Sequence, residues 1–282
     1  MTTPAPAGTL PAHRTPRVRP VTFGRLLAAE WVKLRTLRST WWALAVGVLF
    51  VPLFAVTRMV SIAQVPEAVG ADSLVGAVYV TSGVALTQLV FCTLGVLSVA
   101  GEYGTGQIRS TFTAVPHRTT ALAAKLVVTV GAVMVASVAA VALAWAGSSP
   151  WFEQTGMSID LTSAEDARLL LGVPLYLGAA TALAFGVAAI VRSSAAGIAI
   201  VLGLLLVVEN GLSLIPWEPI QAAAALLPGT AGSRLLQSDA VGSVITTSGV
   251  ADLGPWQGYG VMLVWVAAVL AVATVLLRRR DA

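Results

Sequence analysis

Apolar residues in this chain gather in six long blocks, each close to the length of helix that crosses a lipid bilayer. A hydrocarbon core about 30 Å thick takes roughly 20 helical residues. The blocks lack the short amphipathic periods that are typical of soluble domains. We therefore predict an all-α integral membrane protein with six transmembrane helices. Their expected ranges are 41–60, 76–100, 122–146, 169–191, 195–215 and 257–277.

Residues 21–38, just before the first block, show a different pattern. Apolar and aromatic side chains recur every three or four positions, with cations at other positions, as in a helix that lies in the lipid headgroup layer. Glu30 and Lys33 are spaced to pair on such a helix, which contributes about 0.2–0.5 kcal/mol. We predict an amphipathic cytoplasmic helix, although a plain cationic flank of the first span has a similar composition. The residues expected to contact membrane lipid are Trp31, Lys33, Arg35 and Arg38.

The composition agrees with a membrane protein. Hydrophobic residues make up 57% of the 282 residues and charged residues 11%, and the mean hydropathy is +0.85. A soluble domain carries about 25% charged residues. The net charge of +4 does not indicate nucleic acid as a partner, because the cations cluster beside the apolar blocks. The single cysteine, Cys92, excludes an internal disulfide and a cysteine-based metal cage.

The distribution of cations sets the expected orientation. Residues 1–20 contain no apolar segment typical of a cleaved signal peptide, so we expect a disordered cytoplasmic tail. With this tail inside, every cation except Arg58, Arg168 and Arg234 lies on the cytoplasmic side, as the positive-inside rule requires. We therefore expect both termini in the cytoplasm and residues 21–282 in one transmembrane domain.

The largest expected cytoplasmic loop, residues 101–121, connects the second and third spans. Glu102 marks the exit from the membrane, and Thr105 is placed to cap a short helix. Pro116 would stop that helix, because proline cannot continue one. A short helix held between two spans can act as a lever on both, although an ordinary loop with positive-inside arginines fits the same pattern.

One carboxylate, Glu209, lies well inside an expected span, beside Asn210. Acids within a bilayer are costly and usually face a bundle interior or a cavity. For this pair the open roles are contact with substrate or protons, a hydrogen bond between helices, and access to outer-leaflet water. Residues 220–227 form an apolar stretch too short to cross, for which we expect a re-entrant or interfacial helix.

The chain lacks the residues that common catalytic sites need. A P-loop requires lysine directly after glycine, but the only lysines, Lys33 and Lys125, follow valine and alanine. The only histidines, His13 and His117, are expected in the cytoplasm, so no span offers paired haem ligands or a Ser–His dyad. We therefore expect no enzymatic activity, no metal and no cofactor in this chain.

Three stretches resemble the membrane subunit of a type-2 ABC transporter, the permease that pairs with a separate ATP-binding protein. They read AAEWVKLRTLRSTWWAL at residues 28–44, GEYGTGQIRSTFTAVPHRTTALAAKL at 101–126 and LLPGTAG at 226–232. The order of spans resembles this family along most of the chain. One difference is the outer loop at 147–168, which is longer and more acidic than the family pattern.

The resemblance implies that the loop after the second span is a coupling helix, seated in a groove of an ATP-binding-cassette ATPase. It implies a dimer with a second copy or a sister permease, ATP and magnesium on the partner ATPase, and export of an unidentified substrate across the cell membrane. The turn at 192–194 would make a minor second contact. The residues it assigns to coupling are Glu102, Thr105, Gly106, Arg109, Pro116, Arg118 and Lys125.

Two other functions remain open. An ion-driven secondary transporter uses several ionisable groups and broken helices within the membrane, and Glu209 is the main candidate for such a group here. A membrane anchor or regulatory subunit for a signalling partner would explain the basic surface but not a helical loop held between spans.

Overall fold

The computed structural model describes residues 22–64, 75–107, 118–238 and 253–279. This part of the chain is helical, with turns between the helices and no β-strand. Within it, six helices are long and apolar enough to cross a membrane, which confirms the predicted all-α fold and number of candidate spans. These are Arg38–Ala63, Val84–Thr105, Arg118–Thr155, Ala164–Val191, Ser194–Ser213 and Pro255–Arg279.

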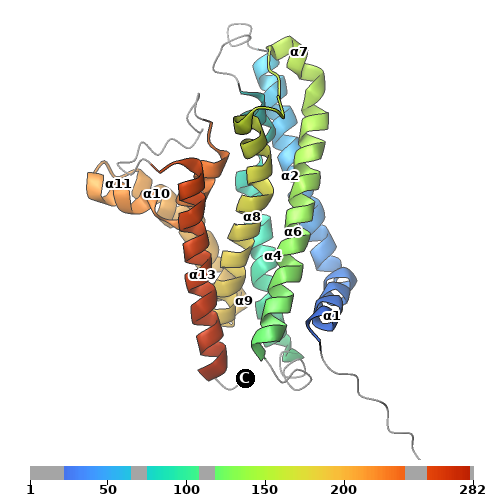
Figure 1. The fold of residues 1–282 in the computed structure, drawn as a ribbon, viewed down its shortest axis with the longest axis vertical. Coiled ribbons are helices and arrows are strands. Elements are labelled where there is room, and N and C mark those ends of the chain that lie inside the picture. Colours follow the sequence, from blue (N-terminus) through green and yellow to red (C-terminus); the bar gives the residue numbers. More distant parts are fainter. Residues whose placement is uncertain (1–21, 65–74, 108–117, 239–252, 280–282) are drawn as a thin grey trace, which may run out of the picture.

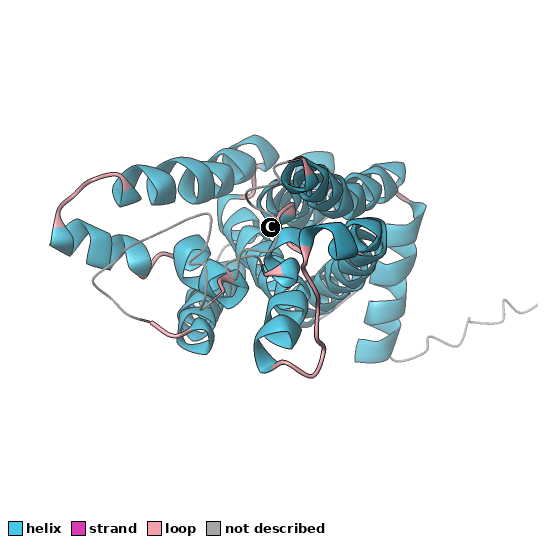
Figure 2. Ribbon diagram, turned by 90° about the horizontal axis from the view of Figure 1, so that it is seen from above, coloured by secondary structure: helices cyan, strands magenta, loops and turns pink. Residues whose placement is uncertain are grey.

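The first two helices are α1 (Phe23–Thr36) and α2 (Arg38–Ala63), separated by Leu37 in an extended conformation. The first span therefore begins three residues earlier than the predicted 41. Figure 2 shows α1 side-on and most of the bundle helices end-on, so α1 lies across the bundle axis. In Figure 1, α1 and the C-terminal end of α13 (Pro255–Arg279) lie at the same end of the bundle, here termed the α1 end.

The second predicted span is not one continuous helix. It divides into α3 (Gly76–Val80), a turn, and α4 (Val84–Thr105), so the expected range 76–100 is helical but interrupted at residues 81–83. The turn brings Gly83 against the backbone of α2, where a Cβ atom would lie 2.5 Å from the Phe50 carbonyl oxygen. At its other end α4 continues past residue 100 and ends at Thr105. The C-cap residue is Gly106, whose φ of 73° favours glycine.

The centre of the bundle is the fourth span, α8 (Ala164–Val191). The Ser163 hydroxyl accepts a hydrogen bond from the backbone N–H of Asp166 and so caps the start of α8. Most of α8 is buried, and it packs against α4, α6 (Arg118–Ser148) and α13 (Pro255–Arg279) (Figure 1). A displacement of any of these three neighbours would therefore change packing contacts of α8.

The fifth span contains a π-helical segment that the sequence analysis did not predict. It consists of α9 (Ser194–Leu202), the π segment η2 (Gly203–Val208) and α10 (Glu209–Ser213). Beyond the π segment, α10 and the following α11 project sideways from the bundle (Figure 1). The remaining short helices are η1 (Ser149–Trp151), α7 (Phe152–Thr155), α11 (Glu218–Ala225), α12 (Pro228–Ser233) and η3 (Arg234–Leu236).

Candidate functional site

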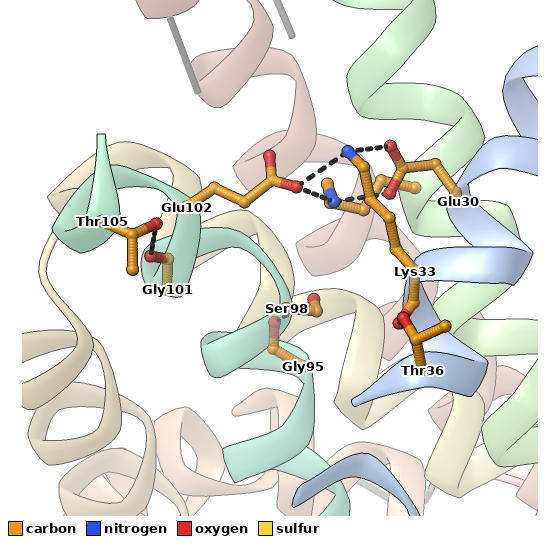
Figure 3. Close-up of polar contacts among 9 residues, drawn as sticks. Glu30, Lys33, Thr36, Gly95, Ser98, Gly101, Glu102 and Thr105 are labelled. Atoms are coloured by element: carbon orange, nitrogen blue, oxygen red, sulfur yellow. Dashed lines mark hydrogen bonds and ion pairs between the residues drawn. The ribbon is translucent and has the colours of Figure 1, made fainter. Parts of the chain in front are cut away.

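Four charged side chains meet at the α1 end: Glu30 and Lys33 from α1, Glu102 from the last turn of α4, and Lys125 from the beginning of α6. The Lys125 ammonium donates to Glu30 Oε2 at 2.5 Å and to Glu102 Oε1 at 2.8 Å. The Lys33 ammonium donates to Glu30 Oε1 at 2.8 Å and to Glu102 Oε1 at 3.0 Å. Figure 3 shows the two carboxylates reaching the ammonium groups from opposite sides. We term these four residues the charge cluster.

The charge cluster is buried and balanced, with two carboxylates and two ammonium groups. The side chains of Glu30, Glu102 and Lys125 are at most 10% exposed, and that of Lys33 is 31% exposed. Removing one partner from a buried ion pair leaves an uncompensated charge, at a cost of about 3–5 kcal/mol. Both lysines of the chain are used here. Loss of any one member would therefore leave an uncompensated charge where these three helices meet.

The pKa of Lys33 reflects these contacts. Burial of the ammonium group favours the neutral form and acts to lower its pKa. The hydrogen bonds and negative charges of Glu30 and Glu102 outweigh this effect, so the pKa of Lys33 is raised above 10.5. Lys33 is consequently charged throughout the physiological pH range.

The charge cluster connects α1 to both helices that flank residues 106–117. Glu102 lies just before the end of α4, and Lys125 lies close to the start of α6. The structure thus brings together two residues predicted for coupling and one, Lys33, predicted for the lipid surface. Lys33 turns toward the bundle because its charge is matched there by two buried carboxylates.

The other predicted coupling residues have different positions. Thr105 is the last residue of α4, and its hydroxyl donates to the Gly101 carbonyl oxygen of that helix at 3.0 Å. The short helix that Thr105 is predicted to cap extends outside the described residues, so its role as an N-cap stays a prediction. Arg118 is the first residue of α6. Arg109 and Pro116 lie outside the described residues.

The turn between α8 and α9 contacts the same end of α4. Arg192 adopts a left-handed conformation with φ of 59°, which is uncommon for a residue other than glycine. Its guanidinium carbon lies 5.1 Å from the centre of the Tyr103 ring, a cation–π arrangement that contributes about 0.5–2 kcal/mol. Since Tyr103 directly follows Glu102, this turn supports the helix end that carries the charge cluster.

A cavity of about 660 Å³ lies beside the charge cluster, between α1, α2, α4 and α6. All four cluster residues line it, and along α4 its lining extends from Leu89 to Thr105. We term it the α1–α4 cavity. Glu102 Oε2 is buried and has no hydrogen-bond partner among the described residues. The polar end of this cavity therefore contains a carboxylate oxygen whose bonding capacity is unused within that part of the chain.

A second, apolar groove of about 580 Å³ lies between α1, α2 and α6. Trp31 and Arg35, both predicted to contact lipid, line this groove. Trp31 is 46% exposed, and Arg38, at the start of α2, is also exposed. Lipid contact by these three residues stays a prediction that their exposure permits.

Glu209 belongs to a second polar site, where the fifth span meets α12. Its carboxylate is buried, Oε1 accepts a hydrogen bond from the Gly229 N–H at 2.8 Å, and Oε2 accepts one from the Thr230 hydroxyl at 3.0 Å. Both donors belong to the first turn of α12, so the carboxylate caps that helix. Of the roles left open for Glu209, the structure contains the hydrogen bond between helices.

Asn210, the neighbour of Glu209, bonds within its own helix. Its side-chain amide donates to the carbonyl oxygens of Leu205 and Leu206, at 3.3 Å and 2.9 Å. A π turn disturbs the regular hydrogen bonding of a helix, and a side-chain donor can compensate for it. Asn210 therefore stabilises the π segment that precedes Glu209.

No family model matches this sequence, and the search of curated proteins also gives no match. Across the described ranges, no group of three or more His, Cys, Asp or Glu side chains could hold a metal ion. The charge cluster and its surroundings are therefore the basis for a functional proposal.

The sequence analysis missed the main role of Glu30, which it paired only with Lys33. The contact between Glu30 and Lys125 joins residues 95 positions apart, so helical spacing could not reveal it. One signal was present in the sequence. Glu30 is the only acidic residue before position 67, and it lies in an otherwise cationic segment. A single acid in that setting indicates a specific cationic partner.

Proposed function

We propose that this chain is the transmembrane permease subunit of an ABC exporter, driven by a separate ATP-binding subunit. The observation that carries the proposal is the charge cluster. It ties α1 to the ends of α4 and α6, and these ends flank the segment that resembles a coupling helix. A force applied to that segment would move α1, α4 and α6 together.

The packing of the bundle supports transmission of such a force. The central helix α8 packs against both α4 and α6, and α2 packs against them as well. Arg192 adds a contact between the α8–α9 turn and the end of α4. Movement at the α1 end would therefore reach the core through several packed helices, as rigid elements transmit displacement better than loops.

The proposal includes an orientation and an assembly. The α1 end faces the cytoplasm, α1 lies in the inner headgroup layer of the cell membrane, and both termini are cytoplasmic, in accord with the positive-inside rule. The chain has no catalytic site. ATP and magnesium bind to the ATPase partner, and two permease chains, identical or sister, form the pathway for an unidentified substrate.

A direct test measures association with an ATP-binding-cassette ATPase from the same cells. The tagged chain is purified from membranes with that ATPase, and ATP hydrolysis of the complex is measured. Glu102→Ala should reduce both association and hydrolysis, whereas Glu209→Gln, at the second polar site, should leave both unchanged. If wild-type chain and ATPase never co-purify, or if both variants behave alike, the proposal is wrong.

The orientation has its own test. In a Cys92→Ser background, Gln107→Cys places a thiol two residues after the end of α4. We expect a membrane-impermeant maleimide to label this thiol only after the cells are permeabilised. Labelling in intact cells would place the α1 end outside and would refute coupling to a cytoplasmic ATPase.

One observation favours the ion-driven alternative. The fifth span combines a π-helical segment with a buried acid, and broken helices with intramembrane acids are features of secondary transporters. Against this alternative, both oxygens of Glu209 are already bonded to α12. Solute uptake by the purified chain along an ion gradient, without any ATPase, would establish it.

A further inference from the structure

The α1–α4 cavity has a charged end and an apolar body. The charge cluster lines one end, and leucine and valine side chains of α4 line much of the remainder. From Leu89 to Thr105, α4 covers about 24 Å at a rise of about 1.5 Å per residue. That length exceeds half of a hydrocarbon core, which is about 15 Å. The cavity is therefore deep enough for an acyl tail below a headgroup.

The unused hydrogen-bond donors and acceptors of the charge cluster indicate which ligand groups this end of the cavity can bind. Glu102 Oε1 accepts from both lysines, while the buried Oε2 has no partner among the described residues. An ammonium group has three N–H donors, and the contacts of Lys33 within that part of the chain use two of them. Lys125 likewise uses two of its three N–H donors within that part of the chain. The site therefore presents one acceptor, Glu102 Oε2, and one donor on each lysine, of which Lys33 is the more exposed.

The charge balance restricts the ligand further. The charge cluster is neutral, and an added net charge in a buried site is costly. A ligand that matches both open positions therefore carries one cationic donor and one anionic acceptor, so that its own charge is zero. Because the cavity body is apolar, the same molecule also carries a hydrocarbon tail.

We propose that the α1–α4 cavity binds a zwitterionic aminophospholipid. Its primary ammonium donates to Glu102 Oε2, its phosphate accepts from Lys33, and one acyl tail lies along α4. This inference goes beyond the proposed function and does not depend on an ATPase. Phosphatidylcholine is the natural comparison, because its headgroup has the same charges but its quaternary ammonium has no N–H to donate.

The binding experiment uses the full chain, purified in detergent and freed of lipid, and native mass spectrometry. Phosphatidylethanolamine and phosphatidylcholine with identical tails are titrated, together with a long-chain alkylamine. A hydrogen bond to a charged group corresponds to about tenfold or more in affinity, which is the preference expected for phosphatidylethanolamine over phosphatidylcholine. Equal binding of the two phospholipids overturns the ammonium contact, and alkylamine binding as tight as phosphatidylethanolamine overturns the phosphate contact.

Two pairs of variants locate the site. Glu102→Gln should abolish the preference between the phospholipids, while Glu30→Gln, which disturbs the same cluster but removes no open acceptor, should retain it. Ser98→Phe fills the cavity without touching the cluster and should weaken both phospholipids at least tenfold, whereas Val264→Phe, on the exposed face of α13, should not. A preference that survives Glu102→Gln, or unchanged binding to Ser98→Phe, contradicts the proposal. Co-purification with the ATPase is scored separately, so either proposal can fail alone.

Discussion

Replacing Lys125 with methionine tests whether the charge cluster holds α1 to the bundle. The change keeps an unbranched side chain and removes the ammonium group that bonds to both carboxylates. Glu30 and Glu102 would then share the ammonium group of Lys33 alone, which is 31% exposed. We expect a loss of about 3 kcal/mol, at the lower end of the range for a broken buried pair, because solvent at Lys33 compensates part of the charge.

The measurement is unfolding in mixed micelles of increasing SDS content, followed by the fluorescence of the eight tryptophans. Arg35→Gln is the matched control, because Arg35 is an exposed cation on the same helix. An exposed substitution of this kind should change the free energy of unfolding by less than about 0.5 kcal/mol.

A double-mutant cycle distinguishes the interaction between Glu30 and Lys125 from the effect of removing a single charge. Adding Glu30→Gln to Lys125→Met removes a carboxylate along with the ammonium. The double variant should therefore lose less free energy of unfolding than the two single variants lose in sum. We expect a coupling energy of about 1 kcal/mol or more. If Lys125→Met costs no more than Arg35→Gln, the cluster does not hold α1, and the reasoning fails.

Three further predictions use the same unfolding assay. Gly229→Ala should destabilise the protein by about 1–3 kcal/mol, because the new Cβ meets the Glu209 carboxylate. Gly260→Ala, inside α13 and facing open space, should instead stabilise by up to about 1 kcal/mol, and equal effects of the two changes would contradict this. Tyr176→Phe removes the hydrogen bond that the Tyr176 hydroxyl donates to Gln88 Oε1 at 2.7 Å and should cost about 1 kcal/mol, and no loss would show that this bond is not stabilising. Because the pKa of Lys33 is raised when the protein folds, its stabilising contribution is complete below pH 10.5 and is lost as the pH rises through the folded value. Lys33→Arg should move this alkaline loss to higher pH, and an unchanged pH profile would refute the assignment.

The six candidate spans could be predicted because hydropathy over some twenty residues is a local property of the sequence. The interruptions of the helices could not. The turn before α4 depends on the contact of Gly83 with the backbone of α2, and the π segment lies beside a carboxylate that bonds to α12. Both features are determined by neighbours distant in the sequence, so no window of adjacent residues contains them.

The residues of the candidate site also differ in how far the sequence could predict their contacts. Glu102 and Lys125 were predicted for coupling because a sequence resemblance marked them, and the structure places them in direct contact. Lys33 was predicted for the lipid surface, and Glu30 was assigned no contact outside α1. Helical periodicity describes which residues share a face, but only the tertiary fold determines whether that face meets lipid or two opposite charges.

The long sequence separation within the charge cluster has a consequence for biosynthesis. The carboxylate of Glu30 finds its closest partner, Lys125, only after 95 further residues have been synthesised. In a nascent chain that stops before the third span, α1 therefore lacks its ion pair with Lys125. We therefore expect the contact between Glu30 and Lys125 to form only after the third hydrophobic segment has entered the membrane.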